Sequence, residues 1–179
     1  MRFTKKILTM ATCAVMAASS MVGMSASAAS YTRTIDNDSI ASGYGNNNTG
    51  FSYINNVSTL ANGDGRYSSS SSSSNSYEWT YPSLTSGGTT VYADITISAY
   101  LAYSSWTDTA AVYGAQYYTF SSKDIGVLNQ NKAPNGYSEM SATFKSETGG
   151  HLSSYAYIKP SGNTNQTTGA DQIKVTISY

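Results

Sequence analysis

The sequence predicts an all-β fold, an antiparallel β-sandwich of the jelly-roll type. Two observations predict it: apolar and polar residues alternate over many short stretches, and turns rich in glycine and asparagine separate those stretches. No window after residue 30 has the 3.6-residue period of an amphipathic helix. Short strands at this spacing are typical of sandwiches and jelly rolls, in which each sheet buries one face against the other.

Alternation with a period of two defines the individual strands. The longest case is 91–101, where every second residue is apolar and lies on one face of the strand: Val91, Ala93, Ile95, Ile97, Ala99 and Leu101. In chain order, the predicted strands are 31–35, 52–59, 77–81, 91–101, 110–118, 125–128, 140–145, 151–158 and 172–179. The turn motifs between them include Asn62-Gly63-Asp64-Gly65, Ser86-Gly87-Gly88, Pro134-Asn135-Gly136, Gly149-Gly150 and Ser161-Gly162-Asn163.

Residues 68–76 interrupt this pattern, because all of them are serine except Asn75. Such a run cannot bury apolar area, so we expect a long, mobile loop between two strands. The segment before it is too short to hold a core of its own, so the run does not mark a domain boundary.

Residues 1–29 predict a secretory signal peptide that is removed. Three basic residues precede an uncharged, mostly apolar or small stretch over 7–24, and Ala26-Ser27-Ala28 suits cleavage after Ala28 or Ala29. The alternative is a membrane anchor, but small residues dilute the apolar stretch and no charge follows it directly. We therefore expect one secreted domain over residues 30–179, extracellular or associated with the cell surface.

The composition of the secreted part excludes several classes of protein. The single cysteine, Cys13, lies in the signal segment, so no disulfide or thiolate metal site is expected. Loss of the signal leaves seven basic residues against ten acidic ones, a net charge of −3, and no second apolar run is long enough to span a membrane. Nucleic acid and anionic membranes require clustered positive charge, so neither is an expected partner.

Catalytic groups are not evident. His151 is the single histidine, and after Gly149-Gly150 it suits a turn that enters a strand; no G-x-S-x-G nucleophile motif is present. The carboxylate pair of a glycoside hydrolase could come from Glu78, Asp94 and Asp108, but solvated surface acids are the simpler interpretation. We therefore expect a protein that is not an enzyme.

Two oxygen-rich segments could hold a metal ion. Asp36-Asn37-Asp38 and Asn62-Gly63-Asp64 offer the oxygen ligands that calcium prefers, although neither has the spacing of an EF-hand. Asx turns are the alternative interpretation of both segments. With one histidine and no cysteine in the secreted part, transition metals are not expected. No cofactor is therefore predicted apart from a structural calcium ion.

Aromatic side chains are the clearest indication of a binding surface. An exposed ring offers an apolar plane with a polar edge, which complements the CH groups and peripheral hydroxyls of a sugar. The candidate ligand-binding residues are Trp106, Tyr103, Tyr155, Tyr157, Tyr92 and Tyr100. Trp106 ranks first because it follows the longest strand among serine, threonine and aspartate residues, a wet, loop-like setting. The alternative is that these rings pack beneath a loop or a second layer.

Several fragments resemble one known family. In order they are Ile35-Asp36-Asn37, Tyr77-Glu78-Trp79-Thr80, 87–103, 106–113, 127–131, Gly136-Tyr137 and 169–175. This order resembles the golvesin C-terminal-like domain, a carbohydrate-binding-like module of bacterial extracellular proteins such as xanthan lyases. The resemblance covers nearly all of the secreted part. It implies a jelly-roll-like sandwich that serves as an accessory module and not as an enzyme.

These expectations together describe a secreted, non-catalytic carbohydrate-binding module whose partner is an extracellular or cell-wall polysaccharide. One alternative is a structural or adhesive cell-envelope protein, in which strands rich in tyrosine, serine, glycine and threonine assemble edge to edge. The other is a small polysaccharide lyase or hydrolase. The sequence specifies neither the sugar nor the oligomeric state.

Overall fold

The computed structural model describes residues 30–38, 44–82, 84–85, 92–118, 121–132, 136–145, 151–152 and 155–178. Over these residues the chain forms fourteen β-strands and two short 3-10 helices, η1 (Ala61–Gly63) and η2 (Gln130–Lys132). The expected signal peptide lies outside the described residues, as do the turns at 86–88, 134–135 and 149–150. The all-β class predicted from the alternation is confirmed.

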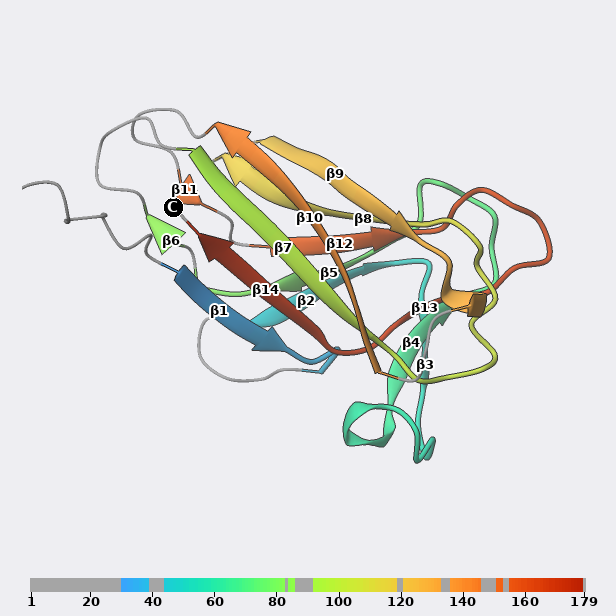
Figure 1. Ribbon diagram of the computed structural model, residues 1–179. Helices are drawn as coiled ribbons and strands as arrows, with labels where there is room; N and C mark the ends of the chain where they lie inside the picture. The colour runs from blue at the N-terminus through green and yellow to red at the C-terminus, as the bar shows by residue number, and fades with distance from the viewer. Residues whose placement is uncertain are drawn as a thin grey trace, which may run out of the picture.

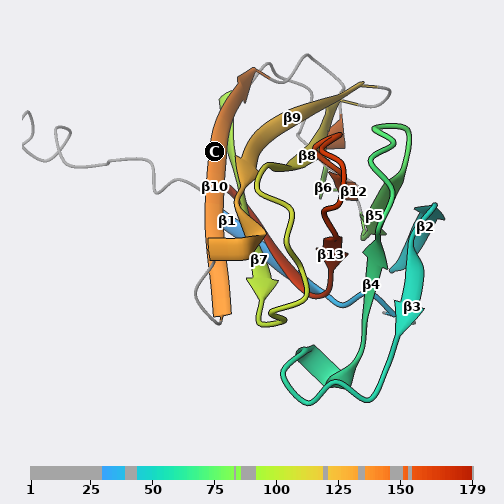
Figure 2. The ribbon, with the colours of Figure 1, turned by 90° about the vertical axis from the view of Figure 1, so that its right-hand side faces the viewer.

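Two antiparallel sheets form the layers of a sandwich (Figures 1 and 2). The four-stranded sheet has the order β1 (Ser30–Ile35), β14 (Ile173–Ser178), β7 (Tyr92–Leu101), β10 (Gly136–Lys145). The five-stranded sheet has the order β2 (Gly45–Thr49), β5 (Ser76–Thr80), β12 (Tyr155–Lys159), β8 (Ala111–Tyr118), β9 (Ser121–Leu128). In Figure 2 the first sheet forms the left-hand layer and β12, β5 and β2 lie to its right.

Two smaller sheets complete the fold. The three-stranded sheet has the order β13 (Thr168–Ala170), β4 (Gly65–Ser68), β3 (Ser52–Ile54), and β11 (His151–Leu152) pairs with β6 (Leu84–Thr85). Strands β3 and β4 form a hairpin whose connection carries η1, and this hairpin extends from one end of the sandwich (Figure 1). The three-stranded sheet matters for function, because it separates the two groups of side chains described below.

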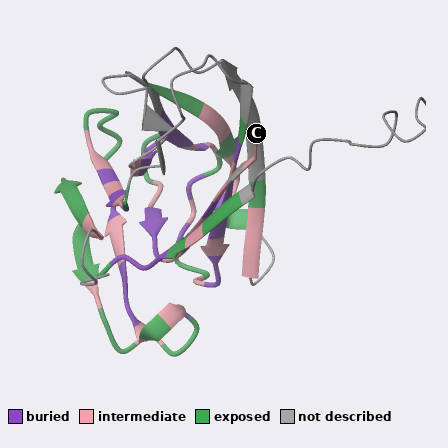
Figure 3. Ribbon diagram, turned by 90° about the vertical axis from the view of Figure 1, so that its left-hand side faces the viewer, coloured by how far each residue is buried: buried purple, intermediate pink, exposed green. Residues whose placement is uncertain are grey.

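The core lies between the two large sheets, as the buried segments in Figure 3 indicate. The stripe predicted on the longest strand is confirmed for Ile95, Ile97, Ala99 and Leu101, all of which are buried. The opposite layer contributes alternate residues of β5, because Tyr77 and Trp79 are both fully buried. The Trp79 Nε1–H donates to the backbone oxygen of Asp171 at 2.8 Å, which satisfies the polar edge of the largest buried ring.

Strands with a buried face match the sequence prediction best. Those at 31–35, 77–81, 91–101, 110–118 and 172–179 agree with the structure to within a residue or two at the described ends, and those at 125–128 and 140–145 extend to 121–128 and 136–145. The stretch 151–158 divides between β11 and β12, which lie in different sheets, and 52–59 ends as a strand at Ile54. The sequence missed β2, β4, β6 and β13. Strand β2 shows why: its GNNNT sequence is mostly exposed, and backbone pairing with β5 holds it instead of burial.

The serine run leaves the three-stranded sheet and enters the five-stranded one. Ser68 ends β4, Ser76 begins β5, and the residues between them form an exposed connection except for the half-buried Asn75. Short-range hydrogen bonds shape it, since the Asn75 side-chain amide donates to Ser68 Oγ at 3.0 Å and the Asn75 backbone N–H donates to the carbonyl of Ser72 at 3.0 Å. The expected loop is therefore present, and its mobility remains a prediction.

Candidate functional site

The three-stranded sheet has two chemically different sides. Neighbouring residues on a strand point to opposite faces, and Tyr53 of β3 is the register partner of Arg66 of β4. Tyr53, Arg66 and the preceding Asp64 therefore lie on one side, which we call the acidic side. Ile54 and Tyr67 lie on the other, which we call the aromatic side.

The aromatic side contains a cleft of about 200 Å³. Its walls, which define the aromatic cleft, are Ile54, Tyr67, Tyr103, Ser105, Trp106 and Thr167. Tyr103 and Trp106 meet edge to face, with ring centroids 5.8 Å apart and an interplanar angle of 88°. Both tyrosines of the cleft are half-buried, so their rings are partly accessible. Aromatic walls with serine and threonine hydroxyls at the rim match the chemistry of a sugar ring.

The prediction that Trp106 is an exposed platform is wrong, because its side chain is 1% exposed. The indole lies directly on Gly169 of β13, where a Cβ would stand 1.8 Å from Trp106 Cδ2, and it also contacts Gly65 of β4. Two glycines on adjacent strands thus make room for the ring, an arrangement between distant segments that the local sequence does not reveal. Trp106 forms the floor of the aromatic cleft, and its Nε1–H has no hydrogen-bond partner among the described residues.

Asp108 holds the connection that carries Trp106. Its carboxylate accepts hydrogen bonds from Thr168 Oγ1 at 2.6 Å, from the Ser161 N–H at 2.9 Å and from the Ala110 N–H at 3.0 Å. Burial alone would raise the pKa of Asp108, but these hydrogen bonds outweigh burial and hold the pKa below its usual value. Asp108 is thus a structural anchor, and Gln130 has a similar role, since its amide bonds both the N–H and the carbonyl of Gly169.

Glu78 and Asp94, considered above as a possible carboxylate pair of a hydrolase, do not form one. Glu78 alternates with buried residues on β5 of the five-stranded sheet, and Asp94 precedes buried Ile95 on β7 of the four-stranded sheet. Each side chain therefore points away from the core on opposite sides of the sandwich, too far apart to flank one bond. The backbone of His151 lies in β11, and its side chain lies outside the described residues.

Tyr155 and Tyr157 lie on the outer face of the five-stranded sheet, but Tyr157 is not the accessible ring that we expected. It is 4% exposed, because its ring lies across Gly114, its register partner on β8. The Tyr157 hydroxyl donates to Asp124 Oδ1 at 2.6 Å, and the Lys159 ammonium lies 4.4 Å from the ring centroid. Tyr155 is half-buried, with its ring centroid 6.5 Å from that of Tyr157.

Tyr100 lies on the outer face of the four-stranded sheet, in a separate aromatic group. It is the register partner of Tyr137 on β10, with ring centroids 5.3 Å apart, and the Lys174 ammonium lies 3.9 Å from the Tyr137 ring. The side chain of Tyr92 lies outside the described residues. The candidates whose side chains are described therefore fall on three surfaces, and only Tyr103 and Trp106 of them share a cleft.

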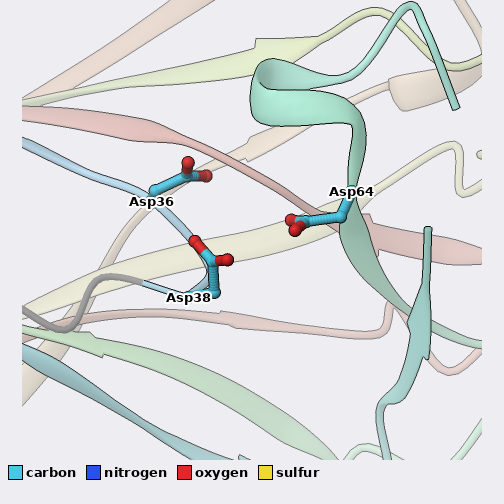
Figure 4. Close-up of side chains that lie close together, drawn as sticks. All are labelled: Asp36, Asp38 and Asp64. Atoms are coloured by element: carbon cyan, nitrogen blue, oxygen red, sulfur yellow. The ribbon is translucent and has the colours of Figure 1, made fainter. Parts of the chain in front are cut away.

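The acidic side contains a larger polar pocket of about 500 Å³. Its lining, which defines the polar pocket, is Tyr53, Asn55, Asn56, Val57, Ser58, Asn62, Gly63 and Asp64. Beside it, Asp36, Asp38 and Asp64 form an acidic cluster in which one carboxylate oxygen from each lies within 4.8 Å of the others. Figure 4 shows the three carboxyl groups directed toward a common space. The fold thus unites the two oxygen-rich segments that the sequence indicated separately.

Sequence reasoning missed Tyr53, Tyr67 and Thr167 as residues that line these pockets. A usable signal was present, because the turn motif Asn62-Gly63-Asp64-Gly65 lies between Tyr53 and Tyr67 and suits the end of a hairpin. Thr167 carried no such signal, since it reaches the cleft through its hydrogen bonds with the connection after β7: its N–H donates to Thr107 Oγ1, and its carbonyl accepts from Thr107 and Asp108.

Comparison with solved structures relates this fold to known proteins. The chain is similar to part of a Paenibacillus xanthan lyase, with a TM-score of 0.55 and 14% identity over 80% of this chain and 13% of the lyase. A CBM35 module from Cellvibrio japonicus Abf62 gives a TM-score of 0.46 and 10% identity, over 82% of this chain and 92% of that module. The CBM29_1 module from Piromyces equi gives a TM-score of 0.45 and 11% identity, over 85% of this chain and 90% of that module.

These similarities are confined to the fold. No known protein family matches the sequence by its profile, and no curated protein matches it. The chain spans about an eighth of the xanthan lyase, so the likeness concerns only a part of that enzyme. Among the described residues, no helix has the length and apolarity needed to cross a membrane.

Proposed function

We propose that this chain is a secreted, non-catalytic module that binds an extracellular or cell-wall glycan in the aromatic cleft. The observation that carries the proposal is the convergence of Tyr67, Tyr103 and Trp106 from two separate segments around one cleft with hydroxyls at its rim. Its volume of about 200 Å³ lies below the range of about 300–1,000 Å³ typical of drug-sized ligands, so it suits one sugar ring at a time.

Tyr67 and Tyr103 take the stacking role that the sequence assigned to Trp106. Their partly accessible rings are the apolar planes of the cleft, and Ser105 and Thr167 supply hydroxyls that can donate to or accept from sugar hydroxyls. Trp106 holds Tyr103 in place through their edge-to-face contact. A carbohydrate is favoured over a purely apolar ligand because aromatic rings and hydroxyl groups line the same small cleft.

The proposed family is that of the golvesin C-terminal-like domains. Two of the fragments that carry the resemblance come together in space, since Ile35 of β1 pairs with Ile173 of β14. The similarity in fold to part of a xanthan lyase agrees with the β-sandwich that this family implies. Secretion is tested by N-terminal sequencing of exported protein, which we expect to begin at Ala29 or Ser30; residues 1–28 intact on the exported protein would contradict it.

The binding proposal is tested by retardation of purified residues 30–179 in gels that contain soluble polysaccharides, followed by titration with the retarding glycan. We expect Tyr67→Ala and Tyr103→Ala each to weaken binding about tenfold or more, which corresponds to about 1.4 kcal/mol for a lost aromatic contact. Tyr155→Ala is the matched control, because it removes a half-buried tyrosine from the outer face of the five-stranded sheet. We expect its affinity to be unchanged.

The alternatives predict other results. If Tyr155→Ala abolishes retardation and the two cleft variants do not, the glycan binds elsewhere and the cleft assignment is wrong. An adhesive envelope protein would form large species without sugar and ignore the polysaccharides. A lyase or hydrolase would generate unsaturated products or new reducing ends, and either result would overturn the non-catalytic assignment.

A further inference from the structure

The acidic cluster has the dimensions of a cation site. Ligand oxygens bind calcium at about 2.3–2.6 Å, so two oxygens on one ion are at most about 5 Å apart. Asp36, Asp38 and Asp64 each place a carboxylate oxygen within 4.8 Å of the others, and Figure 4 shows them facing one space. Asp36 and Asp64 are buried, whereas Asp38 is exposed, which leaves the space accessible from one direction.

A buried amide oxygen adjoins these carboxylates. The Asn37 side chain is fully buried, its backbone N–H donates to Asp36 Oδ1 at 3.0 Å, and its Nδ2 donates to Asp64 Oδ1 at 2.7 Å. The second bond fixes the orientation of the amide, because the reverse orientation would bring two acceptor oxygens together. Among the residues that the structure describes, no donor bonds Asn37 Oδ1, although a buried acceptor without a partner is costly. A cation would satisfy it.

The charges around the cluster are unbalanced. Two neutral groups donate to the buried carboxyl groups: the Asn62 amide bonds Asp36, and the Tyr53 hydroxyl bonds Asp64 at 3.0 Å. Arg66 acts on Asp38, and it is one guanidinium beside three carboxyl groups in the part of the chain that the structure describes. The charges of Asp36 and Asp64 also act on Asp171, whose buried Oδ1 likewise has no partner in the described part of the chain.

We propose that Asp36, Asp38 and Asp64, together with Asn37 Oδ1, form a calcium site that ties the end of β1 to the β3–β4 hairpin. All four ligands are oxygens, which excludes a preference for zinc or copper, and calcium accepts six to eight oxygens in flexible geometry. The polar pocket contains Asp64 and Asn62 and opens to solvent, so water can complete the coordination. Because the ligands come from two segments, the ion stabilises the contact between them.

A shared proton is the competing explanation. Two carboxyl groups in contact can hold one proton between them and so reduce their mutual repulsion. Asp38 and Asp64 are the pair in question, because a carboxylate oxygen of each lies within 4.8 Å of the other. The two explanations differ in their response to metal. Two carboxyl groups that share one proton would give no saturable calcium binding at neutral pH.

The test is calcium titration of chelator-treated protein, followed by calorimetry, with terbium luminescence as a second readout. We expect a 1:1 dissociation constant of about 10⁻⁴ to 10⁻³ M, as in other extracellular calcium modules, and a rise in Tm at saturating calcium. Terbium replaces calcium at oxygen sites and emits when a nearby tyrosine is excited. The hydroxyl of Tyr53 is bonded to Asp64, so we expect calcium-reversible emission.

Matched variants separate the site from general charge effects. Asp38→Asn removes an exposed ligand, so the fold should persist while calcium affinity falls about tenfold or more. Asp94→Asn removes an acid on β7 that is also exposed. Asp94 lies about 17 Å along the strand from Ala99, and Ala99 is the residue of β7 that pairs with Ile173, which in turn pairs with β1. We expect this control to bind calcium as the wild type does.

Three results would overturn the proposal. The first is no rise in Tm and no terbium emission from the wild type at 10 mM ion, about ten times the weakest expected dissociation constant. The second is equal calcium affinity in Asp38→Asn and the wild type. The third is equal loss of affinity in both variants, which would indicate diffuse attraction to surface charge. If Asp38→Asn does not fold, Asp64→Asn and the wild-type terbium titration decide the question.

Discussion

Asp108 and Asp171 are both almost fully buried, at 1% and 2% exposed, yet their surroundings shift the pKa of the two carboxyl groups in opposite directions. Asp108, beside the aromatic cleft, accepts hydrogen bonds from three residues, and these hold its pKa low despite burial. Asp171, near the acidic cluster, accepts a hydrogen bond from the Ala61 N–H at 2.9 Å, and its Oδ1 has no partner among the described residues. Burial, and then the charges of Asp36 and Asp64, raise its pKa to about 8.

This difference distinguishes the two sides of the three-stranded sheet. On the aromatic side, the buried carboxylate is stabilised by the protein's own donors, so the walls of the cleft are complete in the folded chain. On the acidic side, Asn37 Oδ1 and Asp171 Oδ1 are buried without a donor among the described residues, so positive charge from outside the chain would stabilise the fold. A preformed cleft suits a neutral sugar, and an excess of oxygens suits a cation.

The largest effect is expected from Trp106→Ala, which removes the floor of the aromatic side. Loss of a buried indole leaves a cavity and should cost about 3–5 kcal/mol in the free energy of unfolding, measured by denaturant titration. The acidic side should be unaffected, so calcium should raise the Tm of the variant by as much as it raises that of the wild type. A variant of wild-type stability that has lost glycan binding would show that Trp106 is an exposed ligand residue after all.

The sequence predicted the sandwich well because a strand with one buried face shows alternating apolar and polar residues. Ile95 and Ile97 alternate with polar residues, and that alternation is sufficient to place their strand and its inner face. The strands of the three-stranded sheet lack this alternation. They are three or four residues long, and β13 reads Thr168-Gly169-Ala170, with every residue buried. The position of β13 depends on its pairing with β4, about a hundred residues earlier in the chain.

The two candidate sites also differ in how far the sequence could predict them. Two oxygen-rich segments were visible in the sequence, and their union at the acidic cluster needed only that the fold bring Asp36 and Asp64 together. The position of Trp106 was not visible, because it depends on two glycines in other strands that leave space for an indole. Residue type predicts what chemistry is available, whereas the accessibility of a ring depends on packing between segments.

The pH dependence of stability offers the next largest effect. The folded state retains the Asp171 proton up to a pKa of about 8, whereas the unfolded chain releases it near 3.8. The stabilisation is therefore complete below pH 4 and is lost as the pH rises toward 8. We expect denaturation in chelator to show stability falling over this range, and Asp171→Asn to flatten the decline because its amide never ionises.

Asp108→Asn is the matched control for that measurement. The pKa of Asp108 is lowered, so its contribution is present above the unfolded pKa and is lost only on acidification. The decline between pH 4 and pH 8 should therefore persist in Asp108→Asn. Equal slopes in the wild type and Asp171→Asn would show that Asp171 does not hold its proton in the folded state.

A smaller effect is expected from Gly169→Ala, which tests the contact between Trp106 and the sheet. A Cβ at this position would stand 1.8 Å from the indole, so the ring or the strand must move. Overpacking of this kind costs about 1–3 kcal/mol, measured by urea denaturation. We also expect weaker glycan binding, because displacement of Trp106 moves Tyr103, whereas calcium affinity should not change. Stability equal to the wild type would show that the indole has another position available.

The smallest effect is expected from the serine run, which leaves β4, the central strand of the three-stranded sheet. We replace residues 69–74 with a four-residue Gly-Ser link and keep Asn75, because its side chain bonds Ser68 and the carbonyl of Gly50. Loop closure depends weakly on length, so the free energy of unfolding should change by less than about 1 kcal/mol, with glycan and calcium affinities unchanged. Asn75→Ala is the control, and its loss of two anchoring hydrogen bonds should destabilise the protein more. A large fall in Tm for the shortened loop would show that the run supports the sheet and, through it, both sites.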